Sequence, residues 1–319
     1  MKAVGGGFLC QVGDKPHLAS HGSGRRINSF DYFQYLVCVC ALLAANLLCA
    51  KSSAEMECKM IDGHIHIERG AYTLDWINQF VSKAVEMEID EIRLLEHCYK
   101  FEEFVPMYDS VCAYSEYVNA WFHRSAGVHK LAEYLELIER VRNEHFPVEI
   151  KFGLEICYFK EFESFTFELT RGKGFDFLLG SIHFVDDFSF DHKAEHWIGH
   201  DVDKIYRRYF EDSISLAKSR IFDGIGHPDA IKLFGHKPSY SLSDYYESLA
   251  KELSKSNMYA DQNSGVARRC PDTASLGMDG ELLRILKKNN VKIITSSDAH
   301  CPEDVGYKIK ELNSLIASS

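Results

Sequence analysis

The chain contains 319 residues, with 36 Lys or Arg against 47 Asp or Glu, so its formal net charge at pH 7 is −11. This acidic balance argues against a surface that holds a nucleic-acid backbone, because such a surface needs clustered cations. We therefore expect a small, diffusible substrate and no nucleic-acid partner. From residue 56 to the end, the length suits one domain of the size of an α/β barrel, and no segment resembles a linker.

The first 55 residues differ in character from the rest of the chain. Arg25 and Arg26 precede an apolar stretch at 35–50, and small residues follow at 52–54. This order resembles a secretory signal peptide, which would imply export. The apolar stretch is short for a stable membrane span.

A second hypothesis is that residues 1–55 are not part of the functional protein and that translation starts at Met56 or Met60. The later cysteines lack CxxC spacing and are interpreted as reduced thiols, which fits a cytoplasmic protein. Under either hypothesis we expect residues 1–55 to pack poorly on the domain formed by 56–319. We expect no stable membrane association, and the oligomeric state is left open.

Predicted strands and helices alternate along this domain. From the apolar runs and their boundaries, strands are predicted at 60–66, 91–95, 148–155, 175–182, 224–226, 258–260 and 291–296. From the helical spacing of apolar residues, helices are predicted at 73–87, 111–122, 128–144, 202–219, 245–255, 280–288 and 302–316. Strands that alternate with helices predict a parallel sheet, and seven such strands predict an α/β barrel that is closed or nearly closed.

Residues that can bind a metal or accept hydrogen bonds lie at or just after the end of every predicted strand. They are 62–66 (DGHIH), Glu96-His97, Glu155, His183, His227, 261–263 and Asp298-Ala299-His300. Because the carboxyl ends of barrel strands converge on one mouth, this placement predicts a metallohydrolase. Taken singly, a histidine such as His227 is more often a hydrogen-bonded core or surface residue than a ligand. The prediction of a metal site therefore rests on the recurrence of such residues at the ends of successive strands.

The two histidines of the first strand are two residues apart, so His64 and His66 project from the same face and can bind one ion. Asp298 and His300 repeat this arrangement after the last strand. Imidazole suits Zn, Fe or Mn, whereas a carboxylate such as Glu155 can bridge two ions. The pattern therefore predicts a site with more than one metal ion.

Seven segments, in order along the chain, carry a family resemblance. They are DGHIH (62–66), EH (96–97), FGLEICYF (152–159), LLGSIHF (178–184), GHPD (226–229), NSGVAR (263–268) and SSDAHCPEDVGY (296–307). The chain resembles the PHP (polymerase and histidinol phosphatase) family of metal-dependent phosphoesterases, and within it the monofunctional histidinol-phosphate phosphatases. The resemblance implies a single-domain, distorted TIM-like (β/α)7 barrel that binds two or three divalent ions (Zn, Fe or Mn).

The resemblance also implies which residues bind two of these ions. The first ion would take His64, His66, Glu155 and Asp298. The second ion would share Glu155 and take His183 and His227.

A third ion would lie near His97 and His300. The family usually supplies another histidine shortly after HxH, but residues 67–70 of this chain contain none. Glu68 can substitute for that histidine, whereas the neighbouring Arg69 can discourage an ion. Two ions are therefore expected, and the third is left open.

The implied reaction is attack of a metal-activated water on phosphorus, without a covalent intermediate. The proton donors proposed for the leaving group are His97, His300 or a metal-bound water.

Arginine can bind a phosphate through two parallel hydrogen bonds. The candidates for this role are Arg207 or Arg208, which follow the His183 strand, and Arg268 or Arg269 in the segment that begins at 263. Arg268 matches a family position.

The leading functional hypothesis is hydrolysis of L-histidinol phosphate to L-histidinol, a step of histidine biosynthesis. The alternatives are another small phosphate ester or a nucleotide as substrate, nuclease activity, and hydrolysis of C–N bonds by an amidohydrolase. Two further groups stay ambiguous. The aromatic residues Tyr99, Phe101, Phe104 and Tyr108 either stack on the substrate or form core. The segment 192–200, with three histidines, is interpreted as an exposed or substrate-covering loop.

Overall fold

The structure is a computed structural model that describes residues 59–319. The hypotheses on residues 1–55 lie outside the described residues, and so do those on translation start and on a signal peptide. Within 59–319, no helix is long and apolar enough to cross a bilayer.

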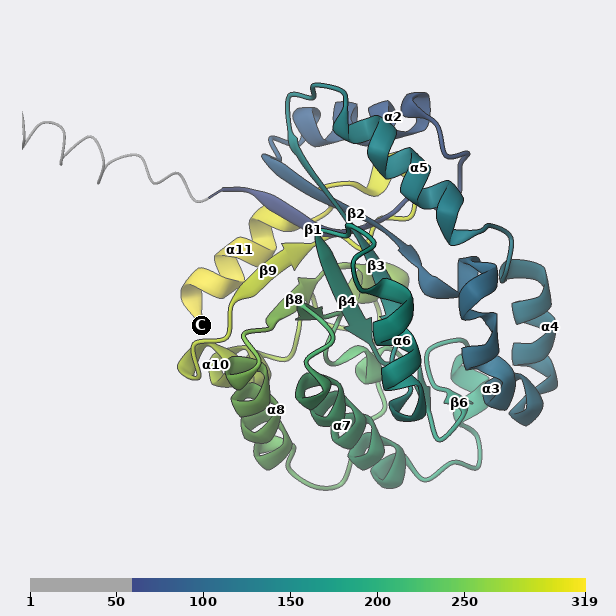
Figure 1. Ribbon diagram of the computed structural model, residues 1–319. Helices are drawn as coiled ribbons and strands as arrows, with labels where there is room; N and C mark the ends of the chain where they lie inside the picture. Colours follow the sequence, from purple (N-terminus) through teal and green to yellow (C-terminus); the bar gives the residue numbers. More distant parts are fainter. Residues whose placement is uncertain (1–58) are drawn as a thin grey trace, which may run out of the picture. The chain divides into compact units, whose positions relative to one another are not determined.

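Seven parallel strands form the sheet at the centre of this part of the chain (Figure 1). In spatial order they are β1 (Ile61–His66), β2 (Glu91–His97), β3 (Glu149–Cys157), β4 (Phe177–Ser181), β7 (Gly224–Ile225), β8 (Tyr259–Asn263) and β9 (Ile293–Ser296). The first and last strands approach each other, because Ile65 pairs with Ala299 and the amide of His66 donates to the carbonyl of Ala299 at 2.7 Å. The prediction of a nearly closed α/β barrel of seven strands is confirmed.

Helices connect the strands and cover the outside of the sheet (Figure 1). In chain order they are α2 (Leu74–Glu86), α5 (Leu131–Arg142), α6 (Glu163–Thr170), α7 (Val202–Ser219), α8 (Ser243–Lys255), α10 (Gly280–Lys288) and α11 (Ile309–Ser318). α2 shows why they form. Thr73 caps it by accepting from the amide of Trp76, and its apolar residues recur at helical spacing and are buried.

Three predicted helices differ from the structure at a specific residue. The helix predicted at 111–122 is interrupted at Ser115, whose extended backbone and hydroxyl cap start a new helix, so that α3 (Asp109–Tyr114) precedes α4 (Glu116–Ser125). The helix predicted at 128–144 begins only at Leu131. The helix predicted at 302–316 begins only at Ile309, because Gly306 and Lys308 have φ angles of +77° and +59°.

The connection after β4 contains a small hairpin that the periodicity did not predict. β5 (Phe184–Val185) and β6 (Phe188–Ser189) pair antiparallel across a turn formed by Asp186 and Asp187, both with positive φ. Such a two-residue turn matches the twist of the flanking strands. The hairpin places the following loop beside the carboxyl ends of the barrel strands.

The barrel contains a small apolar cluster and, towards the carboxyl ends of its strands, a group of buried polar side chains. Near the amino ends of the strands, the interior is filled by Leu95, Phe177, Leu179, Tyr259 and Ile294. Buried Glu91 and Arg93 lie at the start of β2, whereas buried His64, His66, Glu155 and His227 lie at or near the carboxyl ends of their strands. Parallel strand ends therefore bring the polar side chains of separate segments to one place.

Candidate metal centre

The structure brings together all eight side chains that the sequence suggested as ligands. They are His64 and His66 on β1, His97 at the end of β2, Glu155 on β3, His183 after β4, His227 after β7, and Asp298 and His300 after β9. The strand register brings two of them together directly, because His97 on β2 is paired with Glu155 on β3. These residues lie at the carboxyl end of the barrel.

Glu155 lies at the centre of the group. Its Oε2 atom is 3.3 Å from Nε2 of His66 and 3.1 Å from Nε2 of His97. Its Oε1 atom is 3.2 Å from Nε2 of His183 and 3.0 Å from Nε2 of His227. One buried carboxylate therefore has imidazole nitrogens on both oxygens, which is the arrangement expected of a ligand shared by two ions.

The two histidines of β1 meet Asp298 at a second cluster. Nε2 of His64 lies 2.9 Å from Nε2 of His66, and Oδ1 of Asp298 lies 3.6 Å from each. Asp298 and His227 both have positive φ, +54° and +27°. A left-handed backbone is costly for residues other than glycine and is often retained at functional sites.

The donor set fits a divalent metal ion. His64, His66 and Asp298 offer ligand atoms that all lie within 4.8 Å of one another, and so do His97, Glu155 and His183. Among the described residues, Glu155 Oε2 accepts no hydrogen bond although the atom is buried. Neighbouring imidazole nitrogens and an unsatisfied carboxylate oxygen suit Zn, Fe or Mn.

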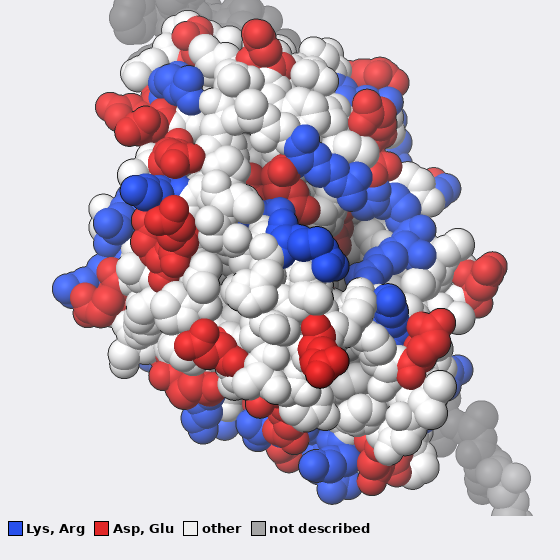
Figure 2. Space-filling view, turned by 90° about the vertical axis from the view of Figure 1, so that its right-hand side faces the viewer, with Lys and Arg blue, Asp and Glu red and all other residues white. Residues whose placement is uncertain are grey.

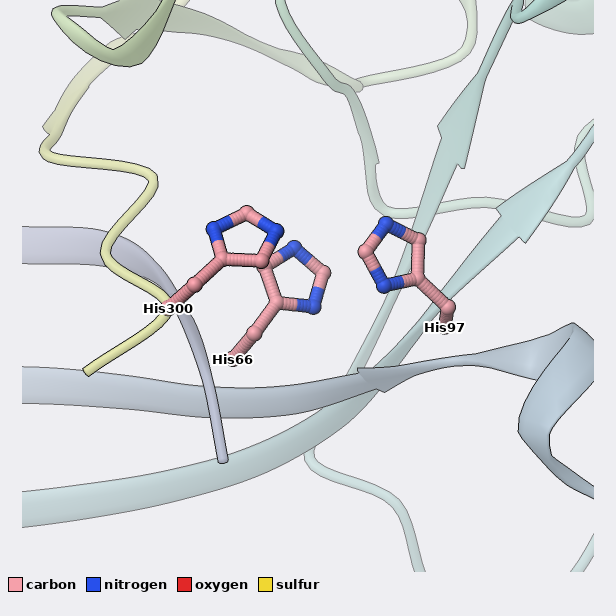
Figure 3. A group of neighbouring side chains, drawn as sticks. All are labelled: His66, His97 and His300. Carbon is pink, nitrogen blue, oxygen red and sulfur yellow. The ribbon is translucent and has the colours of Figure 1, made fainter. Parts of the chain in front are cut away.

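A third group is formed by His66, His97 and His300, whose imidazoles lie next to one another in Figure 3. The ring centroids of His97 and His300 are 3.9 Å and 4.3 Å from that of His66. Glu68 approaches this group, with Oε2 at 3.3 Å from Nδ1 of His97 and Oε1 at 3.7 Å from Nε2 of His300. Lys100 lies 3.4 Å from the same carboxylate and offsets its charge.

Two aspartates hold histidines of the group in one orientation. Nδ1 of His183 donates to Oδ2 of Asp191 at 2.8 Å, and Nδ1 of His64 donates to Oδ2 of Asp261 at 3.0 Å. A carboxylate only accepts, so each bond leaves Nε2 of the histidine free to bind an ion. The sequence marked Asp261 as a strand-end residue but missed Asp191, which no spacing or motif distinguishes.

Asn263 and Gly265 contact two aspartates of the site, Asp261 and Asp298. Asn263 donates to Asp261 at 3.0 Å and accepts from the amide of Gly265 at 2.7 Å. A Cβ atom on Gly265 would lie 2.5 Å from Cβ of Asp298, so only glycine fits at this position.

A cavity of about 310 Å³ opens beside the group of histidines and carboxylates. The face on which α3 and α4 lie is hollowed, and Lys and Arg side chains gather around the hollow (Figure 2). Arg269 lines the cavity, and Lys100 contacts the lining residue Glu68. Cations beside the cavity suit an anionic substrate in spite of the negative net charge.

The structure does not bring the arginines of α7 to this cavity. Arg207 lies 5.6 Å from the ring of Tyr240, and Arg208 pairs with Asp186 and Asp212 at 3.2 Å and 3.1 Å. Neither residue lines the cavity, because α7 directs them toward partners away from it. Their suggested role as phosphate clamps therefore has no support in this geometry.

The two arginines after Asn263 are placed differently. Arg268 pairs with Asp304 and donates to the backbone carbonyl of Asp298 at 2.7 Å. Arg269 lines the cavity and donates to the carbonyl of Asp191. Of the arginines that the sequence suggested, Arg269 is thus the one that a ligand in the cavity can reach.

The sequence model of the PHP domain matches residues 62–265 of this chain. The chain belongs to the PHP family. The histidinol-phosphatase of Bacillus subtilis is 24% identical over 269 residues, which is 77% of this chain and 95% of that one. A curated relative from Deinococcus radiodurans is 27% identical over 188 residues, 57% of this chain and 70% of its own.

A solved structure has the same fold. The histidinol phosphate phosphatase of Lactococcus lactis, crystallised with zinc, L-histidinol and phosphate, superposes with a TM-score of 0.60. It is 18% identical, and the match covers 82% of this chain and 93% of that chain. The likeness bears out the barrel that the resemblance implied.

Proposed function

We propose that this protein is a metal-dependent phosphomonoesterase that hydrolyses L-histidinol phosphate to L-histidinol and phosphate. The observation that carries the proposal is the position of Glu155, a buried carboxylate with histidine nitrogens on both oxygens beside a small cavity. The named substrate rests on the Bacillus subtilis relative and on the Lactococcus lactis complex that contains L-histidinol and phosphate.

The ligands of the first two ions are assigned as the resemblance implies. The first ion takes His64, His66, Glu155 and Asp298. The second shares Glu155 and takes His183 and His227. Bound ions would lower the pKa of a water molecule and neutralise charge on the phosphoryl oxygens. Zinc is supported by the Lactococcus lactis complex, whereas Fe and Mn suit the same donor set.

The third position is assigned to His97, His300 and Glu68. Glu68 takes the place of the histidine that the family usually supplies, and its carboxylate faces both imidazoles. Lys100 competes for the same carboxylate at 3.4 Å. We therefore propose a third ion that is bound more weakly than the other two, so that His97 and His300 are free to donate a proton when it is absent.

The remaining residues act on the substrate itself. Arg269 is assigned to the phosphate group, because a guanidinium on the cavity wall can form two parallel hydrogen bonds to it. The cavity volume of about 310 Å³ suits a small ester rather than a nucleic-acid strand. We propose that the protein acts in the cytoplasm, in keeping with the proposed role in histidine biosynthesis.

The test uses the full-length chain, loaded separately with Zn, Mn or Fe. Its substrates are L-histidinol phosphate, a nucleoside monophosphate, a sugar phosphate and single-stranded DNA. We expect kcat/KM to be highest for L-histidinol phosphate and DNA to remain intact. A higher kcat/KM for another ester would refute the substrate, and no hydrolysis with any metal would refute the phosphatase.

A further inference from the structure

One side of the cavity is aromatic, and its rings form a continuous series that starts at the metal centre. Tyr99 lies 5.0 Å from His97, and Trp121 lies edge-on to Tyr99 at 5.1 Å, between ring centroids. His192 lies edge-on to Trp121 at 4.7 Å, and Tyr117 lies edge-on to His192 at 5.8 Å. We call Tyr99, Trp121, His192 and Tyr117 the aromatic wall, and all four line the cavity.

Helix α4 presents two members of the wall to the cavity rather than to the core. Tyr117 and Trp121 are four residues apart, so they lie on one face of the helix, and both are half-buried. Their neighbours Val118 and Phe122 are buried and pack in the hydrophobic core. One face of α4, with Val118 and Phe122, therefore packs in the core, and the face with Tyr117 and Trp121 is available to a ligand.

The four aromatic residues that the sequence left between core and substrate contact are likewise distributed between the core and the cavity. Phe101 and Phe104 are fully buried and belong to the core. Tyr108 is also buried, with its hydroxyl 3.3 Å from Sγ of Cys98, but it borders the cavity as well. Tyr99 is half-buried and lines the cavity.

Three members of the wall, Tyr99, Tyr117 and Trp121, have polar side-chain atoms without a hydrogen-bond partner among residues 59–319, whereas Nε2 of His192 lies 4.0 Å from Asp191. The indole N–H of Trp76 donates to the carbonyl of Ile67, and that of Trp197 donates to the carbonyl of Phe190, each at 2.8 Å. The indole N–H of Trp121 has no such partner among residues 59–319, and neither has the hydroxyl of Tyr99 or Tyr117. A buried or half-buried indole usually finds an acceptor, so Trp121 has a donor available for a ligand.

We propose that the aromatic wall is the subsite for a flat, nitrogen-containing ring on the alcohol half of the ester, and that Trp121 determines this specificity. The inference rests on the proposed function, because a phosphate at the metal centre directs the rest of the ester along the wall. Tyr99 and Trp121 offer ring faces and edges at the metal end. Lys193 already lies over the ring of Tyr117, 4.4 Å from its centroid, at the outer end.

The test compares two substrates that share a phosphate and an ammonium group, of which one lacks the ring. They are L-histidinol phosphate and O-phosphoethanolamine, and the readout is the ratio of their kcat/KM values in the metal-loaded full-length chain. Loss of ring stacking typically lowers binding by about 10-fold. We expect Trp121→Ala to reduce the ratio by about that factor and Trp121→Phe to restore part of it.

Tyr114→Ala is the matched control, because Tyr114 is an exposed aromatic residue of the neighbouring helix α3 and does not line the cavity. We expect it to leave the ratio unchanged. Binding of L-histidinol to the loaded protein, measured by calorimetry, supplies a readout besides turnover and should weaken in Trp121→Ala only.

The possible failures are distinguishable. Hydrolysis of both esters with an equal ratio in wild type and Trp121→Ala would overturn the subsite and leave the phosphatase intact. An equal loss in Trp121→Ala and Tyr114→Ala would also overturn it, because the effect would then be one of folding. No hydrolysis of either ester by the wild type would refute the proposed function instead.

Discussion

His183 and Asp191 form a hydrogen bond of 2.8 Å between Nδ1 and Oδ2, while Nε2 of the same imidazole faces Glu155 at 3.2 Å. The aspartate follows the hairpin of β5 and β6, so a connecting loop determines the orientation of a residue at the metal centre. Carboxylates that orient metal-binding histidines commonly affect metal affinity strongly, although they never contact the ion.

We expect Asp191→Asn to weaken metal binding by about 10- to 100-fold, because an amide orients Nδ1–H less firmly than a carboxylate. The measurement is the metal content after dialysis against a graded series of chelator concentrations. Asp187→Asn is the control, since this residue lies in the turn of the same hairpin and asparagine tolerates its positive φ of +66°. Equal metal affinity in Asp191→Asn and wild type would contradict the orienting role.

Glu155→Ala and Asp298→Ala should each lower turnover by at least about 100-fold and lower the metal content in parallel. The reason is that Glu155 is proposed to serve two ions and Asp298 lies beside both histidines of β1. Chelation of wild type should reproduce the loss, and added metal should reverse it. Full turnover in a variant without metal would refute the site.

Gly265→Ala should disrupt the metal centre although Gly265 is not itself a proposed ligand. The new Cβ would lie 2.5 Å from Cβ of Asp298, so the aspartate must shift. We expect a lower metal content and a lower kcat with secondary structure retained, as measured by circular dichroism. Gly280→Ala is the matched control, because a Cβ there meets nothing within 4 Å. A fully active Gly265→Ala protein would show that Asp298 tolerates the displacement.

Arg269→Ala should raise KM for the phosphate ester by about 10-fold or more, because it removes the guanidinium that lines the cavity. Inhibition by inorganic phosphate should weaken by a similar factor. Arg208→Ala should change neither constant, since Arg208 pairs with Asp186 and Asp212 instead. A raised KM in Arg208→Ala with an unchanged KM in Arg269→Ala would restore the role that the sequence suggested for Arg208.

Stability should depend on pH through Glu91, far from the metal centre. Burial alone would raise the pKa of Glu91, but hydrogen bonds from Lys59 and Arg93 lower it from 4.5 to about 2. Because the folded-state pKa lies below the unfolded value, the stabilisation is fully present above pH 4.5 and is lost as the pH falls towards 2. Glu91→Gln should lower the free energy of unfolding at pH 7 by about 1–2 kcal/mol, allowing for solvent screening of the lysine.

The measurement is urea unfolding of wild type and variant at pH 7 and near the lower pKa. The difference between the two should nearly vanish at the lower pH. Glu149→Gln is the control, because Glu149 contacts the same Lys59 but its side chain is 49% exposed, so the expected change is smaller. A difference that stays constant with pH would show that Glu91 acts through packing.

Much of the metal centre follows from the sequence because of one geometric property of parallel sheets. Every strand of a barrel ends at the same mouth, so a histidine or carboxylate at a strand end has its location determined once the strand is recognised. His64, Glu155 and Asp298 could be predicted to meet for this reason, although 234 positions separate the first from the last. The HxH spacing added that two imidazoles share a face.

The sequence alone determined the alternation of strands and helices, the set of strand-end ligands and the acidic balance, all of which depend on local periodicity and composition. Only the tertiary structure decided which arginine reaches the cavity, that Asp191 orients His183, and that Trp121 faces the cavity while Phe122 faces the core. Those outcomes depend on loop paths set by single residues, such as the turn at Asp186 and the helix break at Ser115. Contacts between loops distant in sequence leave no periodic pattern, so they emerge only when the chain is folded.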